Sequence, residues 1–213
     1  MTSKYNAFKD KHPQYNFKIE GTTAIGTLPD GTTFKIDADM VETVSHYFFH
    51  LNYKGYVYTL PSLEKRRPTR LHWLVMGYTS NPPFMIDHIN RDKTDCRRCN
   101  LRIVTNQQNS MNRPLGKNNR SGYLGVYFCN TSQRYKSKIC ISGHIIYLLT
   151  SDDKIACAQA YNYAADLLFR EYRGYQNPVP EAPPSIKSIV DAKCAPYLQY
   201  AILATQNQER NYA

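Results

Sequence analysis

Four side chains near the middle of the chain are of the types that hydrolysis of a phosphodiester bond requires. Asp87 and His88 are adjacent, Asn100 follows 12 residues after His88, and Asn109 follows 9 residues after Asn100. An imidazole, with an unperturbed pKa of about 6.5, can be neutral at working pH and take the proton of an attacking water. A divalent cation such as Mg²⁺ keeps several waters and needs only one or two protein oxygen ligands. His88 can therefore be a general base, while Asp87 and Asn109 can bind Mg²⁺, or Mn²⁺ in its place.

Asn100 could serve this chemistry in two ways. Its amide could hold His88 in one tautomer, or it could brace the loop that carries His88. The adjacency of Asp87 and His88 adds a constraint, because neighbouring residues on a strand point to opposite faces. A twist or bulge at the end of the strand would be needed for both side chains to serve one site.

Short elements are predicted to position these residues. A helix is expected over 71–78, ended by the proline-containing stretch 80–83, and a strand follows over 84–89. After the hydrophilic stretch that ends at Asn100, the apolar run 101–104 predicts a second strand.

The next helix has its own start signal. Thr105 and Gln108 match the capping box, in which Ser or Thr is followed three residues later by Glu or Gln. Asn109 then lies just past the first helical turn, early enough for its side chain to face the strand pair.

This pattern resembles the HNH nucleases with the strand–strand–helix (ββα-metal) fold. More narrowly, it is similar to the phage and intron homing endonucleases in which asparagine replaces the last histidine. The resemblance covers residues 70–113 and includes Leu71-His72, 86–90, 95–102 and 104–109. It implies that His88 is the general base, that Asp87 and Asn109 bind the metal, and that Asn100 orients the histidine or its loop.

Two further residues near the site, His72 and Cys96, are not counted among the four site positions. The family often has asparagine where Cys96 stands, but this departure does not touch the four site positions. His72 matches a recurrent histidine of the family and is taken to have a structural role. Cys96 and Cys99 could form half of a zinc site, although no second pair at suitable spacing follows.

Positive charge concentrates around the site residues. The 213-residue chain has a formal net charge of +10, and eleven Lys or Arg residues between 91 and 138 are opposed only by Asp92 and Asp95. Such concentration is typical of proteins that neutralise phosphates, so double-stranded DNA is the expected partner, with Arg98 and Arg102 among its contacts. An ordinary solvated basic surface is the alternative.

A small sheet with one packed helix is predicted further along the chain. After a loose stretch at 114–120, strands are expected over 121–128, 135–141 and 144–149. A helix is expected over 153–172, capped by Asp152.

Residues 120–176 resemble the DNA-binding domain of plant ethylene-response (Apetala-type) factors, which lays a three-stranded sheet in the major groove. Leu149 stands where that family usually has glycine, and Ser151 where it has phenylalanine, so the third strand or its packing could differ. A sheet presents alternate side chains to base edges. The expected DNA contacts are Arg120, Tyr123, Tyr127, Arg134, Lys136 and Lys138.

Both ends of the chain offer no chemistry of their own. The N-terminal part predicts strands at 22–28 and 33–37 joined by a turn at 29–32, a helix at 40–46 capped within Asp37–Asp39, and a strand at 56–58. A basic stretch at 64–70 is expected to be a linker. The C-terminal part begins with prolines and predicts a helix over 186–206.

The predicted fold class is therefore α+β, in four parts. These are a β-rich N-terminal segment (1–69), a ββα-metal nuclease core (70–115), an Apetala-like DNA-binding domain (116–176), and a proline-rich linker with a C-terminal helix (177–213). The sequence contains no run of about 18 apolar residues and no apolar signal-peptide core near Met1. We expect a cytosolic location in the cell that expresses it, which the resemblance places as a phage-infected bacterium, and reduced cysteines.

The favoured function is a sequence-directed, metal-dependent DNA endonuclease of homing type that nicks one strand per active site. A DNA-binding regulator with an inactive nuclease site is the main alternative. A third reading is an RNA-binding or RNA-processing protein, disfavoured because no aromatic RNA-recognition motif is present. Oligomeric state and target sequence are left open by the sequence.

Overall fold

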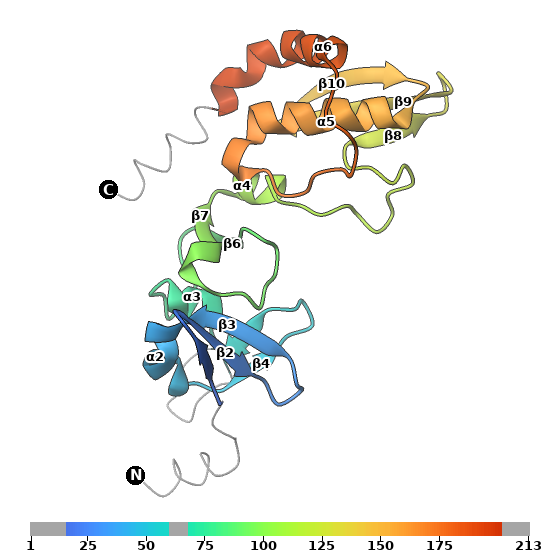
Figure 1. The fold of residues 1–213 in the computed structure, drawn as a ribbon. Helices are drawn as coiled ribbons and strands as arrows, with labels where there is room; N and C mark the ends of the chain where they lie inside the picture. The colour runs from blue at the N-terminus through green and yellow to red at the C-terminus, as the bar shows by residue number, and fades with distance from the viewer. Residues whose placement is uncertain (1–15, 60–67, 202–213) are drawn as a thin grey trace, which may run out of the picture. The chain divides into compact units, whose positions relative to one another are not determined.

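A computed structural model of the chain describes residues 16–59 and 68–201 (Figure 1). Contacts divide the chain into two compact units, Met1–Ile103 and Val104–Ala213. Both units mix helices and strands, so the predicted α+β class is confirmed. Most of the predicted basic linker and the last residues of the predicted C-terminal helix lie outside the described residues.

A three-stranded antiparallel sheet opens the first unit, with β1 (Lys18–Glu20), β2 (Thr23–Thr27) and β3 (Thr33–Asp37) in that order. β2 and β3 are the predicted hairpin, whereas β1 was not predicted. Gly31 supplies the positive φ of 85° in their turn. Gly26 pairs with Phe34, and a Cβ at Gly26 would lie 2.4 Å from the Phe34 ring, so the missing side chain makes room for a core aromatic.

Short elements complete the core of the first unit. The 3₁₀ helix η1 (Ala38–Met40) and α2 (Val41–Ser45) occupy the predicted helical stretch, and β4 (Phe49–Leu51) pairs with β5 (Val57–Thr59). The helix α3 (Leu71–Val75) follows. Together with the hairpin, these elements bury one apolar cluster that includes Phe34, Ile36, Val44, Phe49, Val57, Leu71 and Leu74.

Two helix boundaries in this unit differ from the predictions. Asp37 stands at the N-cap position of η1, but its side chain makes no capping bond, and its Oδ2 instead accepts a hydrogen bond from the backbone N–H of Arg98 at 2.8 Å. α3 ends at Val75, earlier than predicted, because Gly77 takes a positive φ of 86° and donates its N–H to the carbonyl of Leu74. The helix therefore ends at a glycine before the chain reaches the prolines that were predicted to end it.

The predicted strand pair is present. β6 (Met85–His88) and β7 (Leu101–Val104) form a two-stranded sheet, and the 3₁₀ helix η2 (Arg98–Asn100) leads directly into β7. Residues 89–97 form the connection between β6 and η2, which we call the site loop. The site loop is joined to β3, because the backbone N–H of Lys35 donates to Thr94 at 2.9 Å and that of Cys96 donates to Lys35 at 2.8 Å.

The second unit begins with the end of β7 and the helix α4 (Asn106–Met111). Both hydrogen bonds of the predicted capping box form: Gln108 N–H donates to Thr105 Oγ1 at 3.2 Å, and Thr105 N–H donates to Gln108 Oε1 at 2.8 Å. These bonds satisfy backbone donors that the first helical turn leaves without partners, so the helix start is determined locally.

A second antiparallel sheet contains β8 (Val126–Cys129), β9 (Arg134–Ile141) and β10 (His144–Ser151), with β9 in the centre. The helix α5 (Lys154–Phe169) packs against this sheet (Figure 1), and α6 (Pro184–Cys194) packs against α5 and β10. Two 3₁₀ helices, η3 (Arg170–Tyr172) and η4 (Ala195–Tyr197), follow α5 and α6. The predicted sheet and packed helix are therefore confirmed.

Details at the edges of this sheet correct the predictions. β8 begins at Val126 rather than 121, because Gly122 and Gly125 take positive φ angles of 83° and 75° that a strand does not allow. The N-cap of α5 is Asp153 rather than Asp152, since Asp153 Oδ1 accepts the N–H of Ile155 at 2.7 Å.

The two compact units divide at Ile103, inside the stretch that was predicted to be one nuclease core. The site loop belongs to the first unit through its bonds to β3. α4 belongs to the second unit through its contacts with η3 and through Met111, which is part of the apolar cluster of that unit. The division of function among 1–69, 70–115, 116–176 and 177–213 stays a prediction.

Gly125→Ala should destabilise the chain more than Gly122→Ala. Both glycines have positive φ, so each substitution should cost about 1–2 kcal/mol of backbone strain. A Cβ at Gly125 would lie 1.9 Å from the Tyr161 ring, whereas no atom lies within 4 Å of one at Gly122. Overpacking should add about 1–3 kcal/mol at Gly125 alone. Urea unfolding of the two variants measures the difference, and equal losses would contradict the packing argument.

Candidate active site

Asp87 lies in an ion pair between the two strands of the site. The guanidinium of Arg102, on β7, donates to Asp87 Oδ2 from Nε at 3.1 Å and from Nη2 at 2.9 Å. The two side chains are only 11% and 15% exposed. Burial strengthens such a pair because little water screens it. The carboxylate predicted to bind a cation therefore already has a positive neighbour.

Asn100 braces the site loop. Its Nδ2 donates to the backbone carbonyl of Asp95 at 2.7 Å and to Asn90 Oδ1 at 3.0 Å, while its Oδ1 accepts the N–H of Asn90 at 3.0 Å. Its backbone carbonyl also accepts the N–H of Ile89 at 2.8 Å. These bonds join the residues directly after His88 to the start of β7. Of the two roles considered for Asn100, this geometry matches the loop brace.

A second set of bonds makes the site loop rigid. Asn90 Nδ2 donates to Asp95 Oδ2 at 3.1 Å, and Arg97 donates to both carboxylate oxygens of Asp95 at 2.8 and 2.7 Å. Arg91 adopts a positive φ of 66°, which turns the chain away from β6. The loop is thus organised by polar side chains rather than by an apolar core.

His88 is buried against aromatic and sulfur groups. It is 4% exposed, its ring centroid lies 4.8 Å from that of His72 and 6.0 Å from that of Tyr56, and its Nε2 lies 3.8 Å from Cys96 Sγ. Burial lowers the pKa of His88 to about 4, against the opposing influence of carboxylates that include Asp87. The imidazole is therefore neutral at pH 7, the protonation state that a general base needs.

Asp87 and His88 contact different neighbours, as expected for adjacent strand residues. Asp87 pairs with Arg102, whereas His88 lies beside His72 and Cys96. Both residues are nevertheless buried at the end of β6. Asn109 lies on α4 in the second unit, where it is partly buried. That Asp87, His88 and Asn109 serve one ion and one phosphate stays a proposal.

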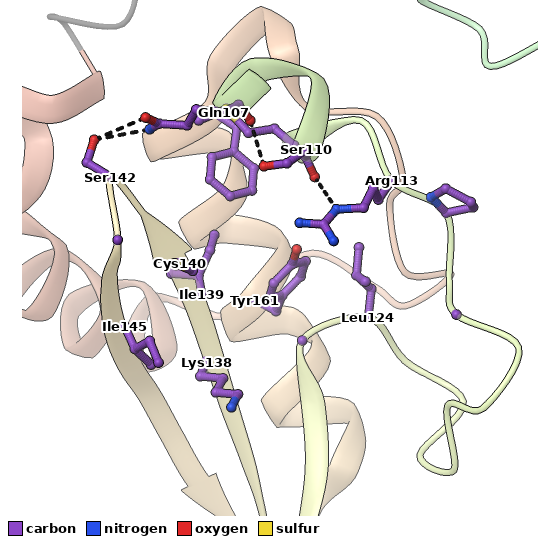
Figure 2. Close-up of a pocket in the computed structure, with 16 residues that line it drawn as sticks. Gln107, Ser110, Arg113, Leu124, Lys138, Ile139, Cys140, Ser142, Ile145 and Tyr161 are labelled. Carbon is purple, nitrogen blue, oxygen red and sulfur yellow. Dashed lines mark hydrogen bonds between the residues drawn. The ribbon is translucent and has the colours of Figure 1, made fainter. Parts of the chain in front are cut away.

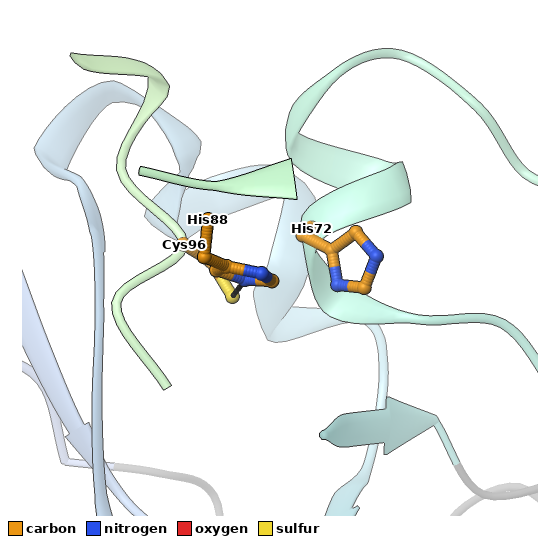
Figure 3. A group of neighbouring side chains, drawn as sticks. All are labelled: His72, His88 and Cys96. Carbon is orange, nitrogen blue, oxygen red and sulfur yellow. Dashed lines mark hydrogen bonds between the residues drawn. The ribbon is translucent and has the colours of Figure 1, made fainter. Parts of the chain in front are cut away.

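Sequence reasoning missed the relationship between His72, His88 and Cys96. His72 is interpreted from the sequence as structural, and Cys96 as a departure that leaves the site untouched. Helix α3 and the site loop bring their side chains beside His88 (Figure 3). Cys96 is fully buried and Cys99 is exposed, so the Cys-x-x-Cys pair does not act together here. The one available signal was the cysteine at a position where asparagine is common.

Two predicted DNA contacts of the first unit have acidic partners. Arg98 Nη1 donates to both oxygens of Asp39 at 2.9 and 2.8 Å, and its backbone N–H donates to Asp37. Arg102 pairs with Asp87 as described. Each arginine would have to share or exchange its carboxylate partner in order to contact a phosphate.

The sheet of the second unit brings four predicted DNA contacts onto one face. In β9, the buried residues Ser137, Ile139 and Ile141 alternate with more exposed ones, so the alternate residues lie on the face away from α5. Tyr127 pairs with one of these alternate residues across the β8–β9 ladder. We call this the open sheet face, and its predicted members are Tyr127, Arg134, Lys136 and Lys138.

The open sheet face also carries exposed side chains that were not among the predicted DNA contacts. Tyr147 is 57% exposed and pairs with Lys138, and Ile145 is exposed next to it. Lys138 Nζ lies 5.2 Å from the Tyr127 ring centroid, which places a cation over an aromatic face. Arg134 is paired with exposed Asp152 at 3.0 Å.

The remaining two predicted contacts, Arg120 and Tyr123, lie in the loop before β8 rather than on a strand. Arg120 is exposed, and the Tyr123 ring centroid lies 5.6 Å from Lys154 Nζ. The departure noted at Leu149 coincides with a register shift between Tyr147 and Leu149 in the β9–β10 ladder. The strand β10 is thus irregular at Leu149, the position where the Apetala-type domains usually have glycine.

A pocket of about 690 Å³ lies at the end of this sheet (Figure 2). Its lining includes Gln107 and Arg113 near α4, Lys138 on β9 and Tyr161 on α5. Arg113 Nε donates to the carbonyl of Ser110 at 2.9 Å, which holds the guanidinium beside the pocket. Two cations thus line the pocket, and one of them, Lys138, also belongs to the open sheet face.

Comparison with known proteins identifies the region that contains this site. Residues 73–111, which contain the strand pair, the site loop and α4, match the model of an HNH endonuclease family. The chain contains an HNH endonuclease domain. Over 146 residues, 67% of this chain and 73% of the relative, it is 28% identical to a protein named as an uncharacterized HNH endonuclease of Acanthamoeba polyphaga mimivirus. No solved structure matches.

The nuclease domain accounts for the predicted enzyme class and implies DNA as the substrate. HNH nucleases typically use divalent metal ions, and the residues that would hold one in this chain stay a prediction. Among the described residues, none of the helices has both the length and the apolarity that crossing a bilayer requires. The Apetala-type resemblance, the homing type, the cell compartment and the identity of the ion stay predictions.

Acid should destabilise the metal-free chain before ordinary carboxylates titrate. Burial lowers the pKa of His72 to about 2 and that of His88 to about 4, whereas both titrate near ~6.5 when unfolded. Between pH 6.5 and about 4 the unfolded state binds more protons than the folded state. The free energy of unfolding should therefore decrease as the pH is lowered, by up to about 1.4 kcal/mol per pH unit for each histidine. Urea unfolding in chelator at pH 7, 6 and 5 measures this slope.

His72→Gln should reduce that slope, and His46→Gln should leave it unchanged, because His46 is exposed. A wild-type stability that is flat between pH 7 and 5 would contradict the burial of neutral imidazoles.

Proposed function

We propose that the chain is a sequence-directed, divalent-metal-dependent DNA endonuclease of homing type that nicks one strand per active site. The observation that carries the proposal is the braced strand pair of the HNH domain, which holds a buried carboxylate and a neutral imidazole on adjacent residues. Duplex DNA is the proposed substrate, and Mg²⁺, or Mn²⁺, the proposed ion.

Asp87 and Asn109 would hold the ion. Asp87 offers a carboxylate oxygen at the end of β6, and the ion would have to share or replace the guanidinium of Arg102 there. Carboxylate and amide oxygens are hard donors of the kind that Mg²⁺ prefers. When bound, the ion supplies charge stabilisation at the phosphate and the leaving oxygen. Arg102 would then be available to pair with a phosphate oxygen, in the manner predicted for a DNA contact.

His88 would take the proton of the attacking water at an imidazole nitrogen. Its burial keeps that nitrogen unprotonated at neutral pH. Asn100 would act through the site loop, since its bonds to Asn90 and Asp95 fix the backbone directly after His88. Loss of this brace would leave the base present but poorly positioned.

The open sheet face would read the DNA. Its cations and aromatic rings come from adjacent strands, and a sheet can present such alternate side chains to the major groove. Arg120, Tyr123 and the cations beside the pocket would extend the contacts along the backbone. Which residue reads a base and which contacts a phosphate is decided only in the complex with DNA.

A DNA-binding regulator with an inactive nuclease site is the second candidate. It is favoured by the 4% exposure of His88 and by the partner that Arg102 already provides for Asp87. Both candidates predict DNA binding that weakens steeply with salt. Metal-dependent product distinguishes them, because only the nuclease forms it.

His88→Ala should abolish cleavage and leave DNA affinity largely unchanged. Loss of a general base typically costs about 10²–10⁴-fold in rate. The matched control is His46→Ala, which removes an exposed imidazole distant from the chemistry in sequence and should cleave like the wild type. Supercoiled plasmid with Mg²⁺, or with chelator, provides the assay. Undiminished cleavage by His88→Ala would refute the assignment of the base.

The same assay tests nicking. One site per chain should produce nicked circles first, with linear product appearing later or at higher enzyme concentration. Linear product without a nicked intermediate at low enzyme concentration would contradict a monomeric nickase.

Lys136→Ala combined with Lys138→Ala should weaken DNA binding and reduce its salt dependence. If both contact phosphates, the slope of log K against log salt should decrease by about two. The control is Lys187→Ala on α6, which removes a lysine paired with Glu181. Fluorescence anisotropy of a labelled duplex at several salt concentrations gives the slopes. Equal slopes for the double variant and the wild type would exclude the open sheet face as the DNA contact.

A further inference from the structure

The cluster of His72, His88 and Cys96 has the composition of a site for a soft or borderline metal ion. One ligand atom from each residue, a ring nitrogen or the sulfur, lies within 4.8 Å of the others. Three separate segments contribute them: α3, the end of β6 and the site loop (Figure 3). The three residues are 1%, 4% and 0% exposed. Such convergence of donors from distant segments is what a metal site requires.

His72 provides an independent sign that a ligand is missing. Both of its ring nitrogens are buried and have no hydrogen-bond partner. Buried polar atoms are almost always satisfied, and an orphaned one calls for an explanation such as an ion. A purely structural histidine would be expected to donate at least one ring N–H to a carbonyl or carboxylate. Coordination through one nitrogen would give His72 the partner that the protein itself does not provide.

The donor types select the ion. Two imidazoles and one thiolate suit Zn²⁺, whereas Mg²⁺ and Ca²⁺ prefer oxygen. This site is therefore chemically distinct from the oxygen donors proposed to hold Mg²⁺. The surrounding charge also favours a cation, since Asp92 and Asp95 act on both His88 and Cys96, opposed at His88 by Lys93.

We propose that His72, His88 and Cys96 bind Zn²⁺, and that this binding inhibits the nuclease by occupying His88. The Cys96 thiol gives its proton to solvent as the sulfur–zinc bond forms, while each neutral imidazole binds through a ring lone pair, so one proton is released per ion. His88 cannot accept a proton from water while its lone pair is coordinated. The inhibitory part rests on the proposed nuclease function, whereas the binding part does not.

Binding is tested with Co²⁺ as a spectroscopic probe. The full-length chain, freed of metal with chelator, should bind one Co²⁺ with a thiolate-to-cobalt charge-transfer band, and Zn²⁺ should remove the band. Cys96→Ser should lose the band, and His72→Gln should weaken cobalt binding at least tenfold. The matched control is Cys99→Ser, which removes an exposed cysteine three positions away and should keep the band.

Each outcome decides the binding claim. No band in the wild type, or an unchanged band in Cys96→Ser, overturns it, since the second result places the ion on another cysteine. Circular dichroism verifies that the variants are folded. If His72→Gln fails to fold, Cys96→Ser carries the test, because it replaces only sulfur by oxygen.

The inhibitory claim is tested by plasmid cleavage in Mg²⁺ with and without stoichiometric Zn²⁺, each variant being compared with itself. For the wild type and Cys99→Ser, the cleavage rate with Zn²⁺ should be at least tenfold lower than the rate without it. For Cys96→Ser, the two rates should be nearly equal. Equal ratios in Cys96→Ser and the wild type overturn inhibition through this cluster. A cobalt band without any cleavage would count against the proposed function alone, and cleavage without a cobalt band would count against this inference alone.

Discussion

The amide of Asn100 is the contact on which the arrangement of the nuclease site depends. It bonds both to Asn90, two residues after the end of β6 at His88, and to Asp95 in the site loop. The loop has little apolar surface to bury, so its conformation rests on these bonds and on the pair between Asp95 and Arg97. Asparagine can do this because one amide both donates twice and accepts. Without that side chain, Asn90 would lose two hydrogen bonds and the carbonyl of Asp95 would lose one.

The braced loop separates two chemical environments that adjacent residues create. Asp87 lies against the guanidinium of Arg102, whereas His88 is buried among aromatic and sulfur groups, and burial lowers its pKa to about 4. The proposed roles of metal ligand and general base call for such different surroundings. The alternation of a strand supplies them within two residues, since consecutive side chains face different surroundings.

Burial of His88 opposes its proposed role in catalysis, since a general base has to contact the attacking water. The same burial brings His88 against His72 and Cys96, in a cluster of donors that soft metals favour. Under the two proposals, His88 either accepts a proton from water or binds the ion, and it cannot do both at once.

Local signals in the sequence predicted much of this protein. The capping box at Thr105, the turn at Gly31 and the alternation in β9 were readable because each depends on neighbours a few residues away. The spacing of Asp87, His88 and Asn100 predicted the nuclease for the same reason. Boundaries set by one glycine φ angle, as at Gly77, were misjudged, because sequence does not show which of several stop signals acts first.

Only the tertiary structure decided what the site residues contact. It paired Arg98 with Asp37 and Asp39, gave Arg102 to Asp87, and set His72 and Cys96 beside His88. Arg98 lies 61 positions from Asp37 in the sequence, and Arg102 lies 15 positions from Asp87. The sequence by itself determined the class of enzyme, because the types of the site residues and the short spacings between them are enough to predict a nuclease. Which groups meet depends on how separate segments pack, and that packing is a property of the whole fold rather than of any local pattern.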